Sequence, residues 1–133
     1  MDTSQNWNRR DPSRRALVVE DDPSVRSLLT ESLELEGFWV DAEPSVEQGR
    51  AWLSSYVYEV VVLDLKLPDG SGMDLVPEAR AQSPNAQVVI MTGFSEEVLR
   101  RRATALGANT FLAKPFTAEE LITAITPRQQ AFG

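Results

Sequence analysis

The chain has 133 residues, the usual size of a single domain, and it contains no histidine and no cysteine. These two absences exclude a Ser-His-Asp or Cys-His catalytic site, a metal site with His or Cys ligands, and a disulfide. The net charge of −7 argues against general nucleic-acid binding, which needs a basic surface. Any metal site must use oxygen ligands, and these favour Mg²⁺, Mn²⁺ or Ca²⁺.

Residues 1–15 are polar and without periodicity, so they predict a flexible N-terminal arm. This segment lacks the apolar centre of a secretory signal, and no apolar run approaches the ~20 residues of a membrane span. We therefore expect a cytoplasmic protein with one domain at residues 16–126 and a tail at residues 127–133.

From residue 16 onward, short apolar runs alternate with segments that have helical spacing. Residues 16–20 are a continuous apolar run that ends in an acid, typical of a strand buried on both faces. The Asp-Pro pair at 22–23 predicts the start of a helix, and Gly37 predicts its end. A second strand is predicted at 38–42, followed by a helix at 45–53 that begins with a serine cap.

The strongest strand pattern lies at residues 60–63 and stops at Asp64. A loop rich in turn residues follows at 66–72. A helix is predicted at 73–82, where Pro77 is acceptable only in the first turn.

The last third of the chain repeats the same alternation. A fourth strand at 87–91 is followed by a helix from Ser95 to residue 106, and a fifth strand is predicted at 110–113. Thr117 and a glutamate three residues later form a capping box that begins a last helix, ending at residue 125. Strict alternation of strands and helices predicts an α/β fold with a parallel sheet and helices on both faces.

In such a sheet, ligands bind outside the carboxyl ends of the strands. The side chains predicted at those ends are Glu20, Asp21, Asp22, Asp64, Thr92 and Lys114. Each alone is also an ordinary helix cap or turn residue, so the indication comes from their joint positions. Crowded carboxylates repel one another, and a divalent cation relieves this repulsion. With oxygen ligands only, Mg²⁺ fits best.

Four segments resemble the receiver domain of two-component response regulators, and they occur in the family's order: VVEDDPSVR, VVVLDLKLPDGSGMDL, VVIMTG and LGANTFLAKPF. The resemblance covers residues 16–126. It implies a doubly wound, five-stranded parallel sheet in the order 2-1-3-4-5, with five helices on both faces.

The resemblance also implies a metal site and a phosphoacceptor. Asp64 matches the carboxylate that takes a phosphoryl group from a histidine of a partner kinase. Asp21 and Asp64 match direct ligands of Mg²⁺, together with the backbone carbonyl of Lys66. Glu20 matches an acid that binds the ion through water, whereas Asp22 is expected to be a helix cap.

Two further residues match the groups that contact the phosphoryl oxygens, namely Thr92 through its hydroxyl and Lys114 through its ammonium group. Pro115 matches a proline that is commonly cis in this family. Phe111 matches a switch aromatic that turns inward when the threonine moves.

The resemblance implies a signalling switch that catalyses only its own phosphorylation and dephosphorylation, so we do not expect an enzyme. The implied partners are a sensor histidine kinase or phosphotransfer protein and a downstream output domain or protein, with no direct nucleic-acid or membrane contact. The output surface would be helix four, strand five and helix five, and a homodimer through this surface is one alternative. On helix four, the spacing of Glu96 to Arg100 and Glu97 to Arg101 predicts intrahelical pairs, with a partner contact as the alternative.

Two other functions remain open. A haloacid-dehalogenase-like phosphohydrolase also uses an aspartate nucleophile, but it needs a second aspartate where this chain has Lys66. The other is a receiver-like binding scaffold that works without phosphorylation. The segment after Ile125 is too short for an output domain, so the sequence leaves open a single-domain regulator or part of a longer one.

Overall fold

The computed structural model describes residues 11–93 and 97–127, and these form a sheet of five strands in the order β2-β1-β3-β4-β5. The strands are β1 (Asp11–Val19), β2 (Phe38–Glu43), β3 (Val60–Asp64), β4 (Gln87–Thr92) and β5 (Thr110–Ala113). Every pair of neighbouring strands is parallel. The predicted fold class and strand order are confirmed.

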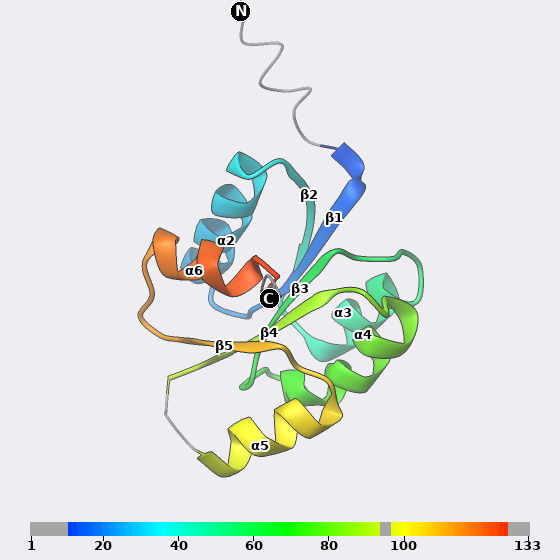
Figure 1. Ribbon diagram of the computed structural model, residues 1–133, viewed down its shortest axis with the longest axis vertical. Coiled ribbons are helices and arrows are strands. Elements are labelled where there is room, and N and C mark those ends of the chain that lie inside the picture. Colours follow the sequence, from blue (N-terminus) through cyan, green and yellow to red (C-terminus); the bar gives the residue numbers. More distant parts are fainter. Residues whose placement is uncertain (1–10, 94–96, 128–133) are drawn as a thin grey trace, which may run out of the picture.

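Helices cover both faces of this sheet (Figure 1). They are α2 (Pro23–Leu35), α3 (Val46–Leu53), α4 (Val76–Gln82), α5 (Glu97–Leu106) and α6 (Ala118–Ile125). The helices α2 and α6 pack on one face, and α3, α4 and α5 pack on the other. None of the helices in the described part of the chain is long and apolar enough to cross a bilayer.

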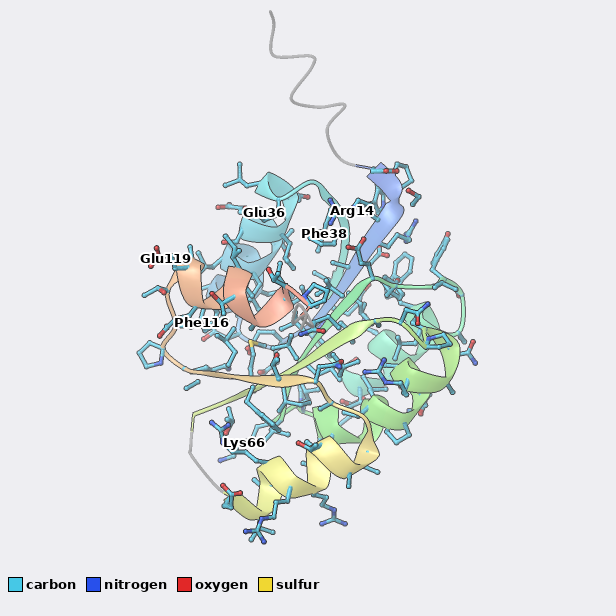
Figure 2. The ribbon with its side chains drawn as sticks, viewed as in Figure 1. Arg14, Glu36, Phe38, Lys66, Phe116 and Glu119 are labelled. Carbon is cyan, nitrogen blue, oxygen red and sulfur yellow. The ribbon has the colours of Figure 1, made fainter. Side chains whose placement is uncertain are left out.

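Strand β1 begins at Asp11, five residues earlier than predicted, so residues 11–15 belong to the sheet rather than to a flexible arm. Arg14 contributes to this extension, because its guanidinium donates two hydrogen bonds of 3.0 Å to the carboxylate of Glu59. The same guanidinium lies 4.5 Å from the ring centroid of Phe38, on β2 (Figure 2). A polar sequence pattern does not reveal such long-range partners.

The next residue, Arg15, has a buried partner instead of an exposed one. Its guanidinium donates to Oδ2 of Asp41 at 2.8 and 3.2 Å, and the hydroxyl of Tyr58 donates to the same oxygen at 2.8 Å. The ring centroid of Tyr56 lies 3.7 Å from the guanidinium carbon. Burial, followed by the carboxylate of Asp41, raises the pKa of Tyr58, which therefore remains a donor.

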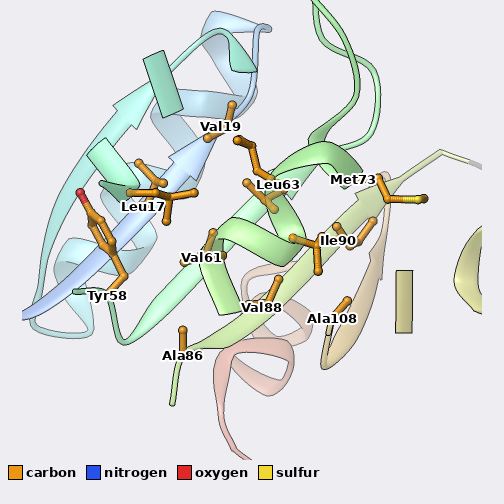
Figure 3. Packing of buried hydrophobic residues seen from close by; sticks show 14 of the residues in the cluster. Leu17, Val19, Tyr58, Val61, Leu63, Met73, Ala86, Val88, Ile90 and Ala108 are labelled. Carbon is orange, nitrogen blue, oxygen red and sulfur yellow. The ribbon is translucent and has the colours of Figure 1, made fainter. Parts of the chain in front are cut away.

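Two clusters of buried side chains fill the space on either side of the sheet. Along β1, Leu17 and Val19 face α3 and α4, whereas Ala16 and Val18 face α2 and α6. Figure 3 shows the first cluster, in which Leu63 of β3 packs near Val19. The central strands are buried on both faces, and this explains their continuous apolar runs.

The helices that have a cap close by in the sequence begin where they are predicted to begin. Asp22 and Ser45 accept hydrogen bonds from backbone N–H groups in the first turns of α2 and α3. Thr117 and Glu120 form a reciprocal capping box at the start of α6. The predicted cap of α5, Ser95, lies outside the described residues.

The single helix predicted at 73–82 is two elements in the structure. A 3-10 turn, η1 (Gly72–Leu75), precedes α4, which begins at Val76. Within a continuous α-helix, the ring of Pro77 would clash with the carbonyl of Met73. The chain avoids this clash because Pro77 lies in the first turn of α4.

Candidate functional site

Four strands end at one edge of the sheet and carry predicted site residues to it. Glu20 follows β1, Asp64 is the last residue of β3, and Thr92 is the last residue of β4. Lys114 follows β5, and its backbone N–H donates to the carbonyl of Thr92 at 2.9 Å. The structure therefore brings these four residues to a common edge, as parallel strands require.

Three carboxylates cluster at this edge. Glu20, Asp21 and Asp64 each offer an oxygen within 4.8 Å of the oxygens of the other two. Glu20 and Asp64 are buried, whereas Asp21 is exposed. A small set of oxygen donors with one side open to water suits Mg²⁺, which keeps several of its own waters when bound. The donor set fits this ion.

Lys114 lies between two of these carboxylates. Its Nζ is 2.8 Å from Oε1 of Glu20 and 3.2 Å from Oδ2 of Asp64. Apart from this ion pair, Oε1 of Glu20 has no hydrogen-bond partner in the described part of the chain. The ammonium group therefore neutralises part of the charge that the acids concentrate here.

The electrostatics of the site follow from burial and from this lysine. Burial raises the pKa of Glu20, and the nearby charge of Asp64 adds to that effect, while Lys114 opposes it. For Lys114, burial alone would lower the pKa, but Glu20 and Asp64 together raise it above its ordinary value. Lys114 is therefore an ammonium ion at neutral pH.

The backbone that carries the acid pair is held by a residue that the sequence analysis missed. Nη1 of Arg26, on α2, donates to the carbonyls of Glu20 at 2.9 Å and Asp21 at 3.3 Å. The backbone N–H of Asp22 donates to Oε2 of Glu20 at 3.0 Å. An arginine after a helix start resembles a surface residue in sequence, so nothing there indicated this role.

The loop after Asp64 returns to pack against that residue's backbone. A Cβ atom at Gly72 would collide with the carbonyl oxygen of Asp64, so only glycine fits without a shift. The N–H of Gly72 donates to the carbonyl of Leu65 at 3.3 Å. Lys66 lies in this loop, two residues after Asp64, and is exposed (Figure 2). The sequence indicated a turn here but not this close approach.

The predicted switch aromatic, Phe111, is half-buried in β5. The guanidinium carbon of Arg100, on α5, lies 4.8 Å from its ring centroid. Arg100 therefore connects α5 to β5, and its predicted partner Glu96 lies outside the described residues. The second predicted pair is present, with 3.3 Å between Arg101 and Glu97.

Comparison with known families accounts for this arrangement. A sequence model of the response regulator receiver domain matches residues 16–126. The chain belongs to this family. It is a receiver domain, the phosphoacceptor module of two-component systems, and thus a signalling domain. Receiver domains bind Mg²⁺ at an acidic site and interact with histidine kinases.

Several curated proteins share this receiver domain. The acid tolerance regulatory protein ActR of Rhizobium meliloti is 32% identical over 117 residues, which are 88% of this chain and 60% of ActR. The two-component response regulator PhoP of Pseudomonas aeruginosa is 35% identical over 121 residues, covering 89% of this chain and 54% of PhoP. The chain thus spans little more than half the length of these relatives.

Solved structures agree with the fold. A response regulator from Burkholderia pseudomallei, with a phosphorylated aspartic acid and a calcium ion, has a TM-score of 0.80 and 25% identity, covering 85% of this chain and 66% of that one. The receiver domain of a sensor histidine kinase from Pseudomonas aeruginosa, with magnesium in its active-site cleft, has a TM-score of 0.73 and 25% identity. It covers 84% of this chain and 93% of that one.

Proposed function

We propose that Asp64 is the phosphoacceptor of this receiver domain. Its carboxylate is buried among two other acids, with Nζ of Lys114 at 3.2 Å, and this placement carries the proposal. A carboxylate oxygen of Asp64 forms a bond to phosphorus as the P–N bond to a donor histidine breaks. The imidazole keeps the electron pair of that bond and takes up a proton. We assign the donor histidine to a sensor kinase or phosphotransfer protein, and residues 1–133 contain no histidine of their own.

The acidic cluster is our proposed Mg²⁺ site. Asp21 and Asp64 would hold the ion directly, Glu20 through a water, and Lys66 through its backbone carbonyl. When bound, Mg²⁺ supplies charge neutralisation at the phosphoryl oxygens. The exposed side of Asp21 leaves room for the waters that this ion retains. The metal ions in the two solved relatives support this assignment.

Lys114 and Thr92 are the proposed contacts for the remaining phosphoryl oxygens. Both lie at the carboxyl ends of neighbouring strands, and the backbone bond between them keeps the strand ends together. Lys114 begins paired with Glu20 and Asp64, so phosphorylation would redirect its ammonium group toward the new oxygens. Transfer needs mainly alignment and charge stabilisation from the protein, and these two side chains supply both.

The proposed output surface is made of α5, β5 and α6, where α5 and α6 are the fourth and fifth α-helices of the described chain. Phosphorylation adds a charge of about −1.5 to −2 at Asp64, and a shift of Thr92 toward the phosphoryl group would move the end of β4. The ring of Phe111 would turn inward and lose its contact with the guanidinium of Arg100. A downstream protein, an output domain or a second copy of the chain would read this change. We assign no nucleic-acid contact to this domain and place it in the cytoplasm, with the kinase.

Labelling with acetyl phosphate tests the proposed function. In the presence of Mg²⁺ we expect intact-mass analysis to detect one phosphoryl group on the wild type and on Asp22→Asn, in which the helix cap is retained. Asp64→Asn is expected to remain unlabelled with an unchanged circular dichroism spectrum. Excess EDTA is expected to prevent labelling. Labelling of Asp64→Asn to the wild-type extent would contradict the assignment, and an unlabelled wild type would favour a phosphorylation-independent scaffold.

A further inference from the structure

The loop between Asp64 and η1 is closed by a tight turn. The N–H of Leu67 donates to the carbonyl of Gly70 at 3.0 Å, and the N–H of Gly70 donates back to Leu67 at 3.3 Å. Gly70 has φ = 150°, a conformation that favours glycine. Asp69 therefore lies at the tip of this turn, three residues after Lys66.

The carboxylate of Asp69 reaches a distant helix. Its Oδ1 accepts from the N–H of Val46 at 2.8 Å, and its Oδ2 accepts from the N–H of Glu47 at 3.0 Å. These are the first two residues of α3, more than 20 positions earlier in the chain. Both bonds favour the charged carboxylate and lower the pKa of Asp69.

Helix α3 already has a local cap. Ser45 accepts from the N–H of Gln48 at 3.2 Å through its hydroxyl. The helix therefore receives caps from two directions, one from its own sequence and one from the loop after the phosphoacceptor. The two caps use different N–H groups, and the bonds to Asp69 connect α3 to that loop.

The helix that Asp69 contacts is fixed against the strand that carries the acid pair. A Cβ at Gly49 would lie 2.8 Å from Cγ2 of Val19, so α3 packs very closely on the last residue of β1. Glu20 and Asp21 follow immediately. A continuous set of contacts thus runs from the acid pair through β1 and α3 to Asp69, and from there into the loop that contains Lys66.

We propose that Asp69 is a positioning residue for the metal site, holding the loop to α3 so that the backbone carbonyl of Lys66 stays in place relative to Asp64. The inference rests on the proposed function, because it concerns the same Mg²⁺ site. Asp69 itself contacts neither metal nor phosphoryl group. Its removal lets the loop move away from the acids, so the protein binds Mg²⁺ more weakly but reacts normally once the ion is bound.

Three variants separate this role from simple helix capping. Asp69→Ala removes both long-range bonds, Asp69→Asn keeps one acceptor oxygen, and Ser45→Ala removes only the local cap. For each variant we would measure the Mg²⁺ concentration that gives half-maximal labelling by acetyl phosphate, the rate at saturating Mg²⁺, and the midpoint of thermal unfolding. A Mg²⁺ titration followed by amide chemical shifts gives the affinity without any labelling.

For Asp69→Ala we expect the half-maximal Mg²⁺ concentration to rise about tenfold, as for other residues that support metal ligands, with the saturated rate retained. The half-maximal Mg²⁺ concentration of Asp69→Asn should lie between those of Asp69→Ala and the wild type. Asp69→Asn also provides the test if the alanine variant does not fold. Ser45→Ala should lower the unfolding midpoint but leave the Mg²⁺ dependence unchanged. An unchanged Mg²⁺ dependence in Asp69→Ala, or an equal shift in Ser45→Ala, would overturn the proposal.

The two proposals fail in different ways. If the wild type binds Mg²⁺ but is never labelled, the proposed phosphoacceptor function is wrong, and the chemical-shift titration alone decides the role of Asp69. If the wild type binds no Mg²⁺, there is no metal site for Asp69 to support, and this inference is wrong as well.

Discussion

Nζ of Lys114 lies 2.8 Å from Oε1 of Glu20, which is completely buried. The lysine also reaches Asp64, at 3.2 Å, so one ammonium group faces two carboxylates in the site. A bound cation and Lys114 would neutralise the same acids. In the absence of a cation, the ion pairs of Lys114 therefore reduce the repulsion between the carboxylates of Glu20 and Asp64.

We expect the stability of the metal-free protein to depend on pH through Glu20. Burial raises the pKa of Glu20, so the folded state binds a proton more readily than the unfolded state does. The free energy of unfolding should then fall as the pH rises from the ordinary value of 4.5 through the raised pKa. In Glu20→Gln that decrease is absent. Relative to the wild type, the variant should therefore become more stable as the pH increases.

Urea unfolding in EDTA at several pH values measures this difference in the free energy of unfolding. The pH values should run from about 4 to 8, a range that includes the usual glutamate pKa. Glu119→Gln, on an exposed residue of α6, is the control and should show no comparable trend. Added Mg²⁺ should favour the ionised acids and reduce the pH dependence of the wild type. A difference between Glu20→Gln and the wild type that stays constant over the whole range would contradict the account.

The adjacent Arg14 and Arg15 provide a matched pair for stability. Arg15 is paired with the buried Asp41, and its removal would leave that carboxylate without its cationic partner. We expect Arg15→Ala to lower the free energy of unfolding by about 3 kcal/mol. Arg14→Ala should cost roughly 1 kcal/mol or less, since both Arg14 and Glu59 are over 40% exposed.

Chemical denaturation of the two variants, measured side by side, tests this difference. Equal losses would mean that the Arg15–Asp41 pair contributes no more than an exposed pair. Loss of structure before residue 16 in Arg15→Ala alone would agree with its expected role in holding the extended β1.

Two glycines near the site should differ sharply in their tolerance of a methyl group. At Gly72 a Cβ would collide with the carbonyl oxygen of Asp64, whereas at Gly93 it would meet no atom of the described residues within 4 Å, its neighbours in the chain aside. Gly72→Ala should therefore destabilise the fold by about 1–3 kcal/mol, the usual cost of overpacking. Gly93→Ala should change stability by about 0.5 kcal/mol at most.

Thermal or urea unfolding of both variants provides the measurement, and amide chemical shifts near Asp64 report the local displacement. We expect the amide shifts near Asp64 to change in Gly72→Ala and to stay at their wild-type values in Gly93→Ala. If Gly72→Ala is as stable as the wild type, the loop does not approach Asp64 as closely as the structure places it.

The parts of the fold that could be predicted from sequence are those set by local patterns. Short apolar runs located the five strands, and caps such as Asp22 and Thr117 located the helix starts, because each signal lies within a few residues of the feature. The edge that collects Asp64 and Lys114 followed from the rule that parallel strands end together. Pro77 indicated a helix boundary, but the prediction placed the α-helix three residues too early.

The parts that could not be predicted depend on partners far apart in the chain. Asp69 resembled an ordinary turn residue, although its carboxylate caps a helix more than 20 residues away. No sequence pattern around Arg26 indicates that its side chain binds the backbone carbonyls of Glu20 and Asp21. The polar residues 11–15 have the sequence pattern of a flexible arm, because the carboxylates that pair with Arg14 and Arg15 are 26 or more positions distant. Side-chain types do not encode such pairings locally.

The most direct test of the central claim is a titration with beryllofluoride and Mg²⁺, followed by amide chemical shifts. Beryllofluoride stands in for the phosphoryl group, so it should bind only where a carboxylate is held beside a metal and a lysine. We predict saturable shifts at Asp64, Thr92 and Lys114 that extend into α5 and β5, require Mg²⁺, and are absent in Asp64→Asn. A wild-type spectrum that does not change, or shifts that persist in Asp64→Asn, would contradict the assignment of Asp64 as the phosphoacceptor.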